Sequence, residues 1–248
     1  MRNRDNWQPS RFVFDGNGQV HVNKDTNEVL IASRFIVEAT ARIYQKYLPQ
    51  HASGKLIDLG CGKVPFYELY KDYVEDIICL DWGNSHHKNL YTDIEADLTK
   101  QLPLDAACCN TILLSDVLEH LPDPLKFWHE MNRILVAEGK VILNVPFYYW
   151  LHEVPYDYYR YTRHGLERMA TNAGFEVLVC EEVEGVPGVM VDLVSKSMMI
   201  LKLPCVNFWI STINRLAISL QDTKPWRFLK YTTMSHLPLG YFMVAIKK

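Results

Sequence analysis

From residue 55 onward, short apolar strands alternate with amphipathic helices, and this alternation constrains the fold more than any other feature of the chain. Strands that are joined through helices form a mostly parallel sheet with helices on both faces. We therefore predict an α/β fold with a seven-stranded sheet. The predicted strands are 55–59, 77–80, 90–92, 111–114, 140–145, 175–183 and 241–246.

Four parts are predicted along the chain. Residues 1–53 are interpreted as an N-terminal extension that includes a helix, and 54–184 as the core. Residues 185–238 are interpreted as a helical insert, after which 239–248 supply the final strand of the core. The 248-residue length accommodates one large domain with such additions.

The extension carries the signal of a β-hairpin. Residues 15–18 read Asp-Gly-Asn-Gly, a strong turn sequence, between the β-prone segments 11–14 and 19–22. A helix should follow, because apolar residues recur every fourth position over 31–47. Pro49 is expected to end this helix.

Two later helices flank the predicted strands. Residues 124–136 have helical spacing, and Thr162 can cap a second helix that Gly174 ends. The apolar face of the first helix is expected to consist of Leu125, Trp128, Met131 and Leu135. The apolar face of the second is expected to consist of Leu166, Met169, Ala170 and Ala173.

Residues 186–220 form the most apolar late stretch. Ordinary helical packing is the preferred interpretation, with the buried face formed by Met190, Val194, Met198 and Leu201. A cap over an apolar acceptor, a dimer face and a peripheral membrane contact are the alternatives. The uncharged run 203–214 is too short to span a bilayer, so no transmembrane segment is predicted.

Composition excludes several classes of protein. The hydrophobic content of 48% supports a packed core, and the net charge of −3 without any basic run argues against a nucleic-acid partner. The charged N-terminus has no following apolar stretch, so no secretory signal is expected. The six cysteines include no Cys-x-x-Cys pair, which fits thiols in a reducing cytoplasm.

A glycine-rich turn follows the first core strand. Gly60 and Gly62 allow a tight bend that a ligand can approach, and Cys61 lies between them. Asp58, just before the bend, suits a ligand with an ammonium group. Pro65 stands where a dinucleotide-binding fingerprint would have its third glycine, and it could open a helix.

Acidic residues follow the next two predicted strands. Asp81 ends the second strand about 20 residues beyond the glycines, where a carboxylate can bind both hydroxyls of a ribose. Trp82 could pack on a base. Asp97 and Leu98 offer a carboxylate and a backbone N–H for an adenine edge. The adjacent residues His86 and His87 are expected to be solvated loop residues.

Together these segments resemble the class I S-adenosylmethionine-dependent methyltransferases, in particular a type 11-like branch that acts on small molecules or surface glycans. The resemblance covers about residues 54–184 and includes the segment 115–120, Ser-Asp-Val-Leu-Glu-His. It implies a Rossmann-like fold whose last strand is reversed, and S-adenosylmethionine as the cofactor. It implies cofactor contacts from Asp58, Gly60, Cys61, Gly62, Asp81, Trp82, Asp97, Leu98, Ser115 and His120. The third glycine usual in that loop is Val64 here.

The acceptor is expected near residues 146–161, which follow the fifth predicted strand and are rich in aromatic residues. His152 or Asp157 could act as general base, and His120 is the other candidate. Arg160 could hold a phosphate or carboxylate, or pair with Asp157. The tyrosines in this stretch could equally stack on an acceptor or fill the end of the sheet.

This stretch also resembles a His-Glu-x-Pro-x-Asp-Tyr-x-Arg-Tyr-Thr segment of bacterial methyltransferases, several of them tied to surface polysaccharide. The resemblance implies methyl transfer by in-line displacement to a small-molecule or sugar acceptor, with polysaccharide biosynthesis as the setting. Glu119 and His120 have no third ligand that the sequence would place beside them, so no metal is predicted.

Two other functions compete with methyl transfer. An NAD-dependent nucleotide-sugar enzyme would share the strand, the glycine turn and Asp81, but Pro65 argues against it. A non-catalytic member of the same fold would bind the cofactor without using it. A methyltransferase acting on nucleic-acid bases is disfavoured, because residues 115–118 lack the Asn/Asp-Pro-Pro-aromatic sequence of adenine-N6 enzymes.

Overall fold

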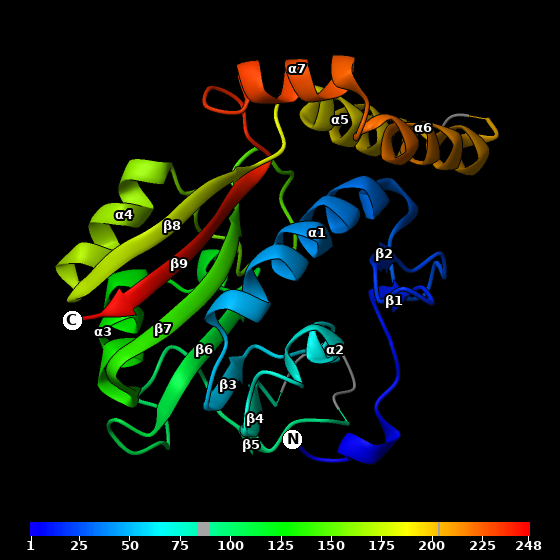
Figure 1. The fold of residues 1–248 in the computed structure, drawn as a ribbon. Coiled ribbons are helices and arrows are strands. Elements are labelled where there is room, and N and C mark those ends of the chain that lie inside the picture. The colour runs from blue at the N-terminus through cyan, green and yellow to red at the C-terminus, as the bar shows by residue number, and fades with distance from the viewer. Residues whose placement is uncertain (84–89, 203) are drawn as a thin grey trace. The chain divides into compact units, whose positions relative to one another are not determined.

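The computed structural model describes residues 1–83, 90–202 and 204–248, so His86 and His87 lie outside the described residues. The chain forms two compact units (Figure 1). We call residues 1–8, 46–181 and 241–248 the sheet unit, and residues 9–45 and 182–240 the helical unit.

The sheet unit contains the predicted seven-stranded sheet, in the order β5-β4-β3-β6-β7-β9-β8. The paired strands from β3 to β7 run parallel, and the last strand is reversed, which confirms the expected Rossmann-like fold. The strands are β3 (Lys55–Leu59), β4 (Asp76–Asp81), β5 (Ile94–Glu95), β6 (Cys109–Ser115), β7 (Leu135–Pro146), β8 (Phe175–Val183) and β9 (Gly240–Lys247).

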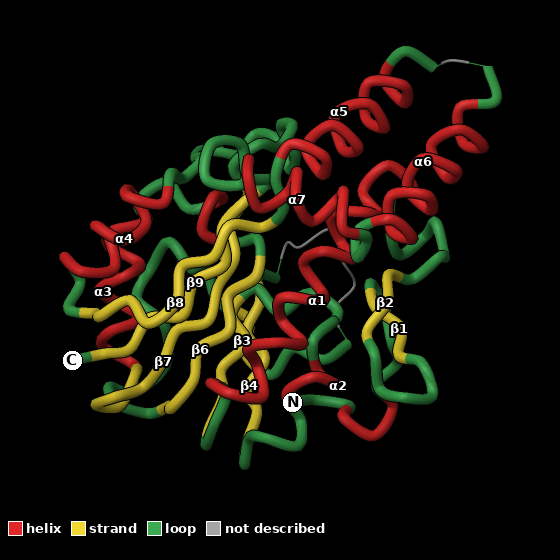
Figure 2. The backbone as a smooth tube through the Cα atoms, turned by 45° about the horizontal axis from the view of Figure 1, so that its top comes forward, coloured by secondary structure: helices red, strands yellow, loops and turns green. Residues whose placement is uncertain are grey.

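Helices cover both faces of this sheet (Figure 2). On one face lie α3 (Pro124–Ile134) and α4 (Arg163–Asn172), and on the other lies α2 (Tyr67–Tyr70). Trp128 of α3 is fully buried and meets Phe175 of β8 with ring centroids 5.2 Å apart. Phe242 of β9 stacks on Tyr47, near the end of α1 (Arg34–His51), at 5.1 Å.

The register aligns the carboxyl ends of the strands. Leu59 at the end of β3 pairs with Leu80, and Asp81 of β4 pairs with Glu95 of β5. On the other side of β3, the ends of β6 and β7 meet where Ser115 pairs with Asn144. Loops that follow these strands therefore leave the sheet at one edge, which is where ligands bind to parallel sheets.

The helical unit has a small core of its own. The predicted hairpin is present as β1 (Phe12–Phe14) and β2 (Val20–Val22). The short 3₁₀ helix η2 (Ile31–Ser33) belongs to this unit, whereas η1 (Arg4–Asn6) belongs to the sheet unit. Three helices follow β8: α5 (Val186–Ile200), α6 (Val206–Leu220) and α7 (Lys224–Thr233). The buried apolar cluster of this unit consists of Phe35, Val189, Ala217 and Leu239.

The predicted buried face of α5 is wrong. Met190 and Leu201 are 50% and 68% exposed, and Val194 is also exposed. The buried positions instead include Asp192 and Lys196, whose side chains form an ion pair with 2.7 Å between Oδ2 and Nζ. The ion pair allows these two charged side chains to be buried, because charges stay buried only when they are paired. The helix therefore buries the face that carries this pair and not the face that the apolar spacing predicts.

Two predicted helix boundaries shift at prolines. Helix α1 continues through Pro49 to His51, because a proline in the last turn removes only one helical hydrogen bond while Leu48 beside it is fully buried. Pro65 does not open a helix. Helix α2 begins at Tyr67, and Pro65 belongs to the preceding loop.

Two further boundaries are set by strand pairing. The weak strand lies at 94–95 rather than 90–92, because the side chain of Asp93 accepts a hydrogen bond from the Cys79 N–H and displaces the ladder at that point. Helix α3 ends at Ile134, and Leu135 already pairs in β7. Leu125 is 36% exposed and does not belong to the buried face.

Candidate functional site

The bend after β3 is built on two glycines in the left-handed region. Gly60 and Gly62 have φ angles of 71° and 48°. A Cβ on Gly60 would lie 2.6 Å from Cγ2 of Val117, so no larger residue fits there. A Cβ on Gly62 would meet nothing within 4 Å, which leaves open space beside the backbone. The bend can therefore be approached closely by a ligand at Gly62.

Val64 keeps a glycine-like backbone at the position of the missing third glycine. Its φ is 51°, which is costly for a β-branched residue. Its N–H donates to the Cys61 carbonyl at 2.8 Å, and its carbonyl accepts from Nε1 of Trp7 at 3.1 Å. These bonds and complete burial hold Val64 in place, so the bend keeps its turn without the glycine.

Asp81 at the end of β4 is bound to the glycine bend. Its Oδ2 accepts from the Gly62 N–H at 2.9 Å, and its Oδ1 accepts from the Trp82 N–H at 2.7 Å. The backbone carbonyl of the preceding residue, Leu80, accepts hydrogen bonds from the N–H groups of Gly60 and Cys61. The structure thus brings together Asp81 and the bend, as the sequence predicts.

Asp58 is a buried carboxylate beside the same bend. Its side chain is 4% exposed, and its Oδ2 has no hydrogen-bond partner. Burial, together with the nearby charge of Asp81, raises the pKa of Asp58 to about 8. Two acids in a confined space are stabilised by a cation, so this corner suits an ammonium group.

Asp58 should make the ligand-free protein less stable as the pH rises. Because its pKa is raised in the folded state, its stabilising contribution is complete below the unfolded value near pH 4 and is lost as the pH rises to about 8. We compare the free energy of unfolding of Asp58→Asn with that of the unchanged protein. The difference should shift in favour of the variant between pH 6 and pH 8, by up to about 1 kcal/mol per pH unit. Urea unfolding of both proteins at both pH values measures this. A constant difference between them would contradict the prediction.

Asp97 and Leu98 are only partly brought into this site. The Ala96 N–H donates to the Asp81 carbonyl, so the end of β5 lies beside the end of β4. The Asp97 carboxylate, however, accepts from the N–H and hydroxyl of Thr99, which lowers its pKa. Leu98 lines a separate cavity of about 490 Å³ toward the start of α3, which neither Gly62 nor Asp81 lines.

A polar group joins the ends of β6 and β7. Ser115 Oγ donates to Asn144 Oδ1 at 2.8 Å, and Asn144 Nδ2 donates to Asp116 Oδ1 at 2.5 Å. Asp116 has a φ of 52°, so the chain turns sharply as it leaves β6. Ser115 is a predicted site residue, whereas Asn144 is not. Its signal was a single amide directly after the apolar run 141–143.

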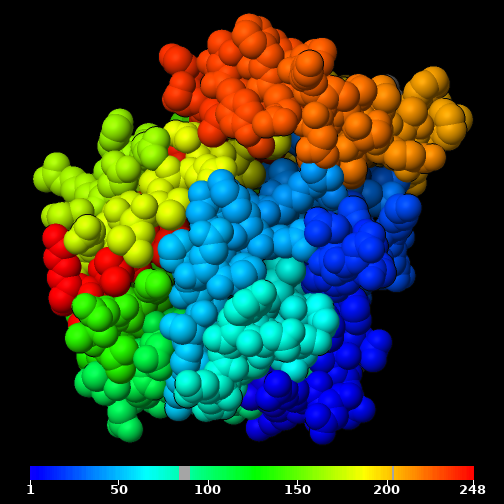
Figure 3. Space-filling model, in the orientation of Figure 1, coloured from blue at the N-terminus to red at the C-terminus, as the bar shows by residue number. Residues whose placement is uncertain are grey.

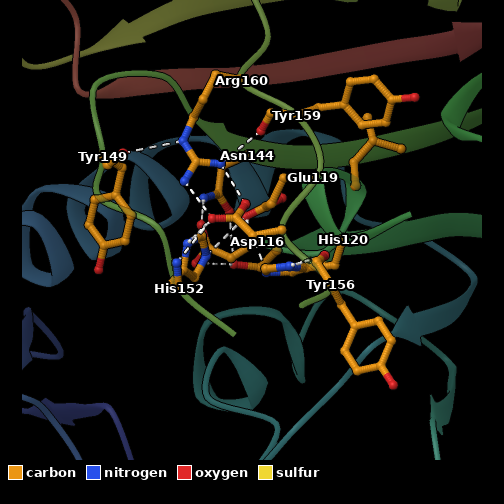
Figure 4. A network of polar contacts seen from close by, with 12 residues as sticks. Asp116, Glu119, His120, Asn144, Tyr149, His152, Tyr156, Tyr159 and Arg160 are labelled. Carbon is orange, nitrogen blue, oxygen red and sulfur yellow. Dashed lines mark hydrogen bonds and ion pairs between the residues drawn. The ribbon is translucent and has the colours of Figure 1, made fainter. Parts of the chain in front are cut away.

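Glu119 and two histidines form a compact cluster next to this turn (Figure 4). Glu119 lies in η3 (Leu118–His120), is fully buried, and neither of its carboxylate oxygens has a hydrogen-bond partner. Nε2 of His120 and Nε2 of His152 each lie 3.8 Å from Glu119 Oε1. The two imidazole rings meet edge to face, with centroids 4.7 Å apart. The fold therefore brings both predicted histidines to one point.

The other nitrogen of each histidine lies next to an oxygen atom. Nδ1 of His120 lies 3.0 Å from the Tyr156 carbonyl. Nδ1 of His152 lies 3.2 Å from Asp157 Oδ2 without the geometry of a hydrogen bond, and this oxygen accepts from the His152 backbone N–H at 3.0 Å. Burial lowers the pKa of His152, but the neighbouring Glu119 and Asp157 carboxylates raise it overall. Burial raises the pKa of Glu119.

Arg160 holds the loop that carries His152. Its guanidinium forms two hydrogen bonds with Asp157, at 2.6 and 2.8 Å, and donates to the carbonyls of Trp150 and Tyr159, each at 2.8 Å. This hydrogen bonding holds the pKa of Asp157 well below its usual range. Asp157 is therefore a poor proton acceptor, and the alternative in which Arg160 pairs with Asp157 is the one observed.

Replacing Arg160 should loosen this loop. In Arg160→Met, the 2% exposed Asp157 carboxylate loses its cation, and the carbonyls of Tyr149, Trp150 and Tyr159 lose their donor. We expect the free energy of unfolding to fall by about 2 kcal/mol, which urea denaturation measures. The exposed Arg168 of α4 provides the control, since Arg168→Met should change stability by less than about 0.5 kcal/mol. Equal effects in both variants would contradict the assigned role.

The tyrosines of this loop divide into packed and exposed side chains. Tyr161 is buried and donates to the Leu118 carbonyl at 2.9 Å, and Tyr159 stacks on it at 5.7 Å. Tyr156 remains 47% exposed and meets the Trp82 ring edge to face at 5.6 Å. Tyr148 is also exposed. The outer rings, rather than Tyr161, are thus free to contact an acceptor.

The amino-acid sequence matches a known protein family. A family profile described as a methyltransferase domain matches residues 32–179, more than half of the chain. The chain belongs to this methyltransferase domain family. It is similar to a probable S-adenosylmethionine-dependent methyltransferase of Mycobacterium tuberculosis, with 26% identity over 110 residues. A similarly named protein of Mycolicibacterium smegmatis is 28% identical over 109 residues.

These curated relatives are matched over less than half of their length. The aligned part covers 42% of this chain and 40% of the M. tuberculosis protein, and 42% of each chain for M. smegmatis. Among solved structures, the chain is similar to an S-adenosylmethionine-dependent methyltransferase from Archaeoglobus fulgidus, with a TM-score of 0.55 and 17% identity over 88% of this chain and 98% of that one. One from Mesorhizobium loti has a TM-score of 0.52 and 16% identity over 84% and 98%. This similarity supports the fold.

Proposed function

We propose that this member of the methyltransferase domain family binds S-adenosylmethionine and transfers its methyl group to a small-molecule or sugar acceptor. The observation that carries the proposal is the buried Asp58 oxygen without a hydrogen-bond partner, next to Asp81 and the open side of Gly62. An ammonium-bearing nucleoside fits these three features together. The amino-acid part of the cofactor pairs with Asp58, and its ribose hydroxyls bind Asp81.

The remaining cofactor contacts follow from their positions in the site. The backbone of the bend around Cys61 would lie along the amino-acid part, and Trp82 offers an exposed ring face for the base. Asp97 and Leu98 are proposed for the adenine edge, which requires the Asp97 carboxylate to exchange its bond with Thr99 for one with the exocyclic amine. Ser115 borders the site from β6. The bound cofactor supplies a methyl group that is already activated on a positively charged sulfur.

The protein then has to align the acceptor and remove its proton. The exposed rings of Tyr148 and Tyr156 can stack on the face of a sugar. The His120–His152 cluster is the place where the proton of an acceptor hydroxyl leaves. Asp157 orients His152, and Arg160 fixes Asp157, so these two act as positioning residues. This chemistry suits a cytoplasmic step of glycan or polysaccharide biosynthesis.

Calorimetry and a labelled-methyl assay test the function. Calorimetry should detect binding of S-adenosylmethionine and not of NAD. Label from the methyl group should then appear in one class of a panel of nucleotide sugars, free sugars and small hydroxylated or amino compounds. Binding of NAD alone would favour the nucleotide-sugar enzyme instead. Cofactor binding without transfer to any acceptor would favour a non-catalytic member of the fold.

We also propose that helices α5 to α7 carry a contact with an anionic membrane surface. Large apolar side chains of these helices are exposed, among them Leu201, Phe208, Trp209 and Phe228, each more than half exposed. Figure 3 shows α6 and α7 as part of the molecular surface, in orange. Residues 186–233 include six basic and two acidic residues. The buried ion pair of Lys196 and Asp192 accounts for one of each, which leaves five basic residues and one acidic residue. Apolar side chains with surrounding positive charge are typical of helices that bind anionic lipids.

None of the described helices is both long and apolar enough to cross a bilayer, so this contact would be peripheral. Sedimentation with vesicles of phosphatidylcholine, with and without phosphatidylserine, tests it. The protein should sediment only with the anionic vesicles, and the double variant Phe208→Ser/Trp209→Ser should remain in the supernatant. Lack of sedimentation by the unchanged protein would overturn this contact and leave the proposed chemistry untouched.

A further inference from the structure

We propose that Glu119, His120 and His152 form a binding site for a divalent transition-metal cation. One carboxylate oxygen and the two Nε2 atoms converge, with both nitrogens 3.8 Å from the same Oε1 atom. Their three ligand atoms all lie within 4.8 Å of one another. The chain places the third ligand far from the other two in sequence, and only the loop after β7 brings it close (Figure 4).

This ligand set and its spacing suit a cation such as Zn²⁺, Co²⁺ or Fe²⁺. Two imidazoles and one carboxylate are the protein ligands of open catalytic zinc and iron sites. In a tetrahedral site with bonds near 2.0–2.1 Å, neighbouring ligand atoms are roughly 3.3 Å apart. The observed 3.8 Å separations therefore need a contraction of about half an ångström. The remaining separation is at most 4.8 Å, so side-chain rotation would have to bring the two nitrogens closer by up to about 1.5 Å.

The carboxylate of Glu119 makes a cation favourable at this point. It is fully buried, and neither oxygen has a hydrogen-bond partner. A buried carboxylate without partners is costly, and a bound cation removes that cost. The charged side chains around Glu119 are Asp116, Asp157 and Arg160. Together with Glu119 there are three carboxylates and one guanidinium, so the net charge of the site is negative when the histidines are neutral.

The outer contacts prepare both histidines as ligands. Nδ1 of His152 faces the Asp157 carboxylate at 3.2 Å, and Nδ1 of His120 faces the Tyr156 carbonyl at 3.0 Å. The Tyr156 carbonyl favours a proton on Nδ1 of His120 and leaves its Nε2 lone pair directed toward Glu119. Nδ1 of His152 lacks hydrogen-bond geometry to Asp157, and a small rotation of its ring would let the carboxylate accept from it in the same way. Carboxylate–histidine and carbonyl–histidine contacts are the usual support of histidine ligands in metal sites.

The three residues leave coordination positions open. The side chains of His120 and His152 are 14% and 21% exposed, whereas Glu119 is closed off, so the cation would be reached from one side. On the proposed function, on which this role but not the binding rests, the histidines would promote the loss of the acceptor proton through the cation that they hold. A hydroxyl oxygen of the acceptor would take an open position, and its proton would pass to water. The oxygen then forms its bond to the methyl carbon as the carbon–sulfur bond breaks, and that electron pair leaves with the sulfur.

Metal binding is tested without reference to activity. The full chain is stripped with a chelator and titrated with Zn²⁺ by calorimetry, and with Co²⁺ while its visible absorption is recorded. We expect one ion per chain and the absorption of a cobalt ion with nitrogen and oxygen ligands. Glu119→Gln and His152→Ala should each weaken binding at least about hundredfold. His164→Ala is the matched control, because His164 also lies near a glutamate, Glu167, but is 91% exposed and has no third ligand beside it among the described residues.

The outcomes separate this proposal from the proposed function. An unchanged protein that binds S-adenosylmethionine and methylates an acceptor, but takes up neither Zn²⁺ nor Co²⁺, overturns the metal site and leaves the methyltransferase standing. A protein that binds one ion through these residues, but not S-adenosylmethionine, supports the metal site and overturns the proposed function. If Glu119→Gln unfolds, His152→Ala decides, since His152 lies on a surface loop. Equal affinities in His152→Ala, His164→Ala and the unchanged protein would overturn the site.

Discussion

Replacing Asp81 with alanine is expected to weaken S-adenosylmethionine binding by at least about a hundredfold, as measured by calorimetry. A carboxylate that accepts two hydroxyl hydrogen bonds contributes roughly 3 kcal/mol or more when its partners are enclosed. In this chain Asp81 does a second task, because its Oδ2 holds the Gly62 N–H at 2.9 Å. The variant therefore loses both the ribose contact and the fixed position of the glycine bend.

Asp76 provides the matched control at the opposite end of the same strand. Its side chain is 64% exposed, and it lies away from the bend, so Asp76→Ala should keep full affinity. Asp81→Asn adds a finer comparison, because it keeps one oxygen that can accept from Gly62. The far-UV circular dichroism of all variants should be unchanged. Unaltered cofactor affinity in Asp81→Ala would remove Asp81 from the site.

Where local signals agreed with the packing, the sequence predicted the fold closely. The strands 55–59 and 175–183 have the observed boundaries, because their apolar residues end there at a glycine or a polar residue. Failures occurred where a side-chain contact outweighed the apolar pattern. Asp93 displaced the pairing of the edge strand, and the buried Asp192–Lys196 pair reversed the face of α5. This pair has the i,i+4 spacing of a helical ion pair, but nothing in the sequence shows that it is buried.

The site was predictable to a different extent on its two sides. On the cofactor side, the glycines and Asp81 come at the ends of two strands that are adjacent and parallel, so the sheet brings them close together. The hydrogen bond from the Gly62 N–H to Asp81 shows this contact. On the acceptor side, the histidines lie on separate loops after different strands. Their meeting at Glu119 depends on the path of the loop that Arg160 holds, which no periodic pattern encodes.

Arg160 illustrates why residue type alone was insufficient there. A guanidinium in an aromatic loop is compatible with binding a phosphate or with holding the loop together. The structure engages it with Asp157 and with backbone carbonyls, and Asp157 in turn lies against His152. The sequence motif therefore encodes a support for one histidine, and its effect on chemistry should pass through that histidine.

Replacing His152 with alanine is accordingly expected to lower turnover by at least about a hundredfold while the affinity for S-adenosylmethionine changes less than about twofold. A group that handles a proton typically contributes a factor of 10² to 10⁴ to the rate. The proposed cofactor contacts lie at Asp58, Gly62 and Asp81, and the Asp81 carboxylate is held by hydrogen bonds from the N–H groups of Gly62 and Trp82. Rates with labelled cofactor and calorimetric affinities for the same preparation measure the two effects.

The exposed His164 of α4 again serves as the control, because His164→Ala removes an imidazole without touching the cluster. It should retain full turnover. Asp157→Asn should show a smaller loss than His152→Ala, since it leaves the imidazole present but changes the charge that orients it. Full turnover in His152→Ala would exclude the histidine cluster from the reaction. Equal losses in His152→Ala and His164→Ala would show an effect of imidazole removal that does not depend on the site.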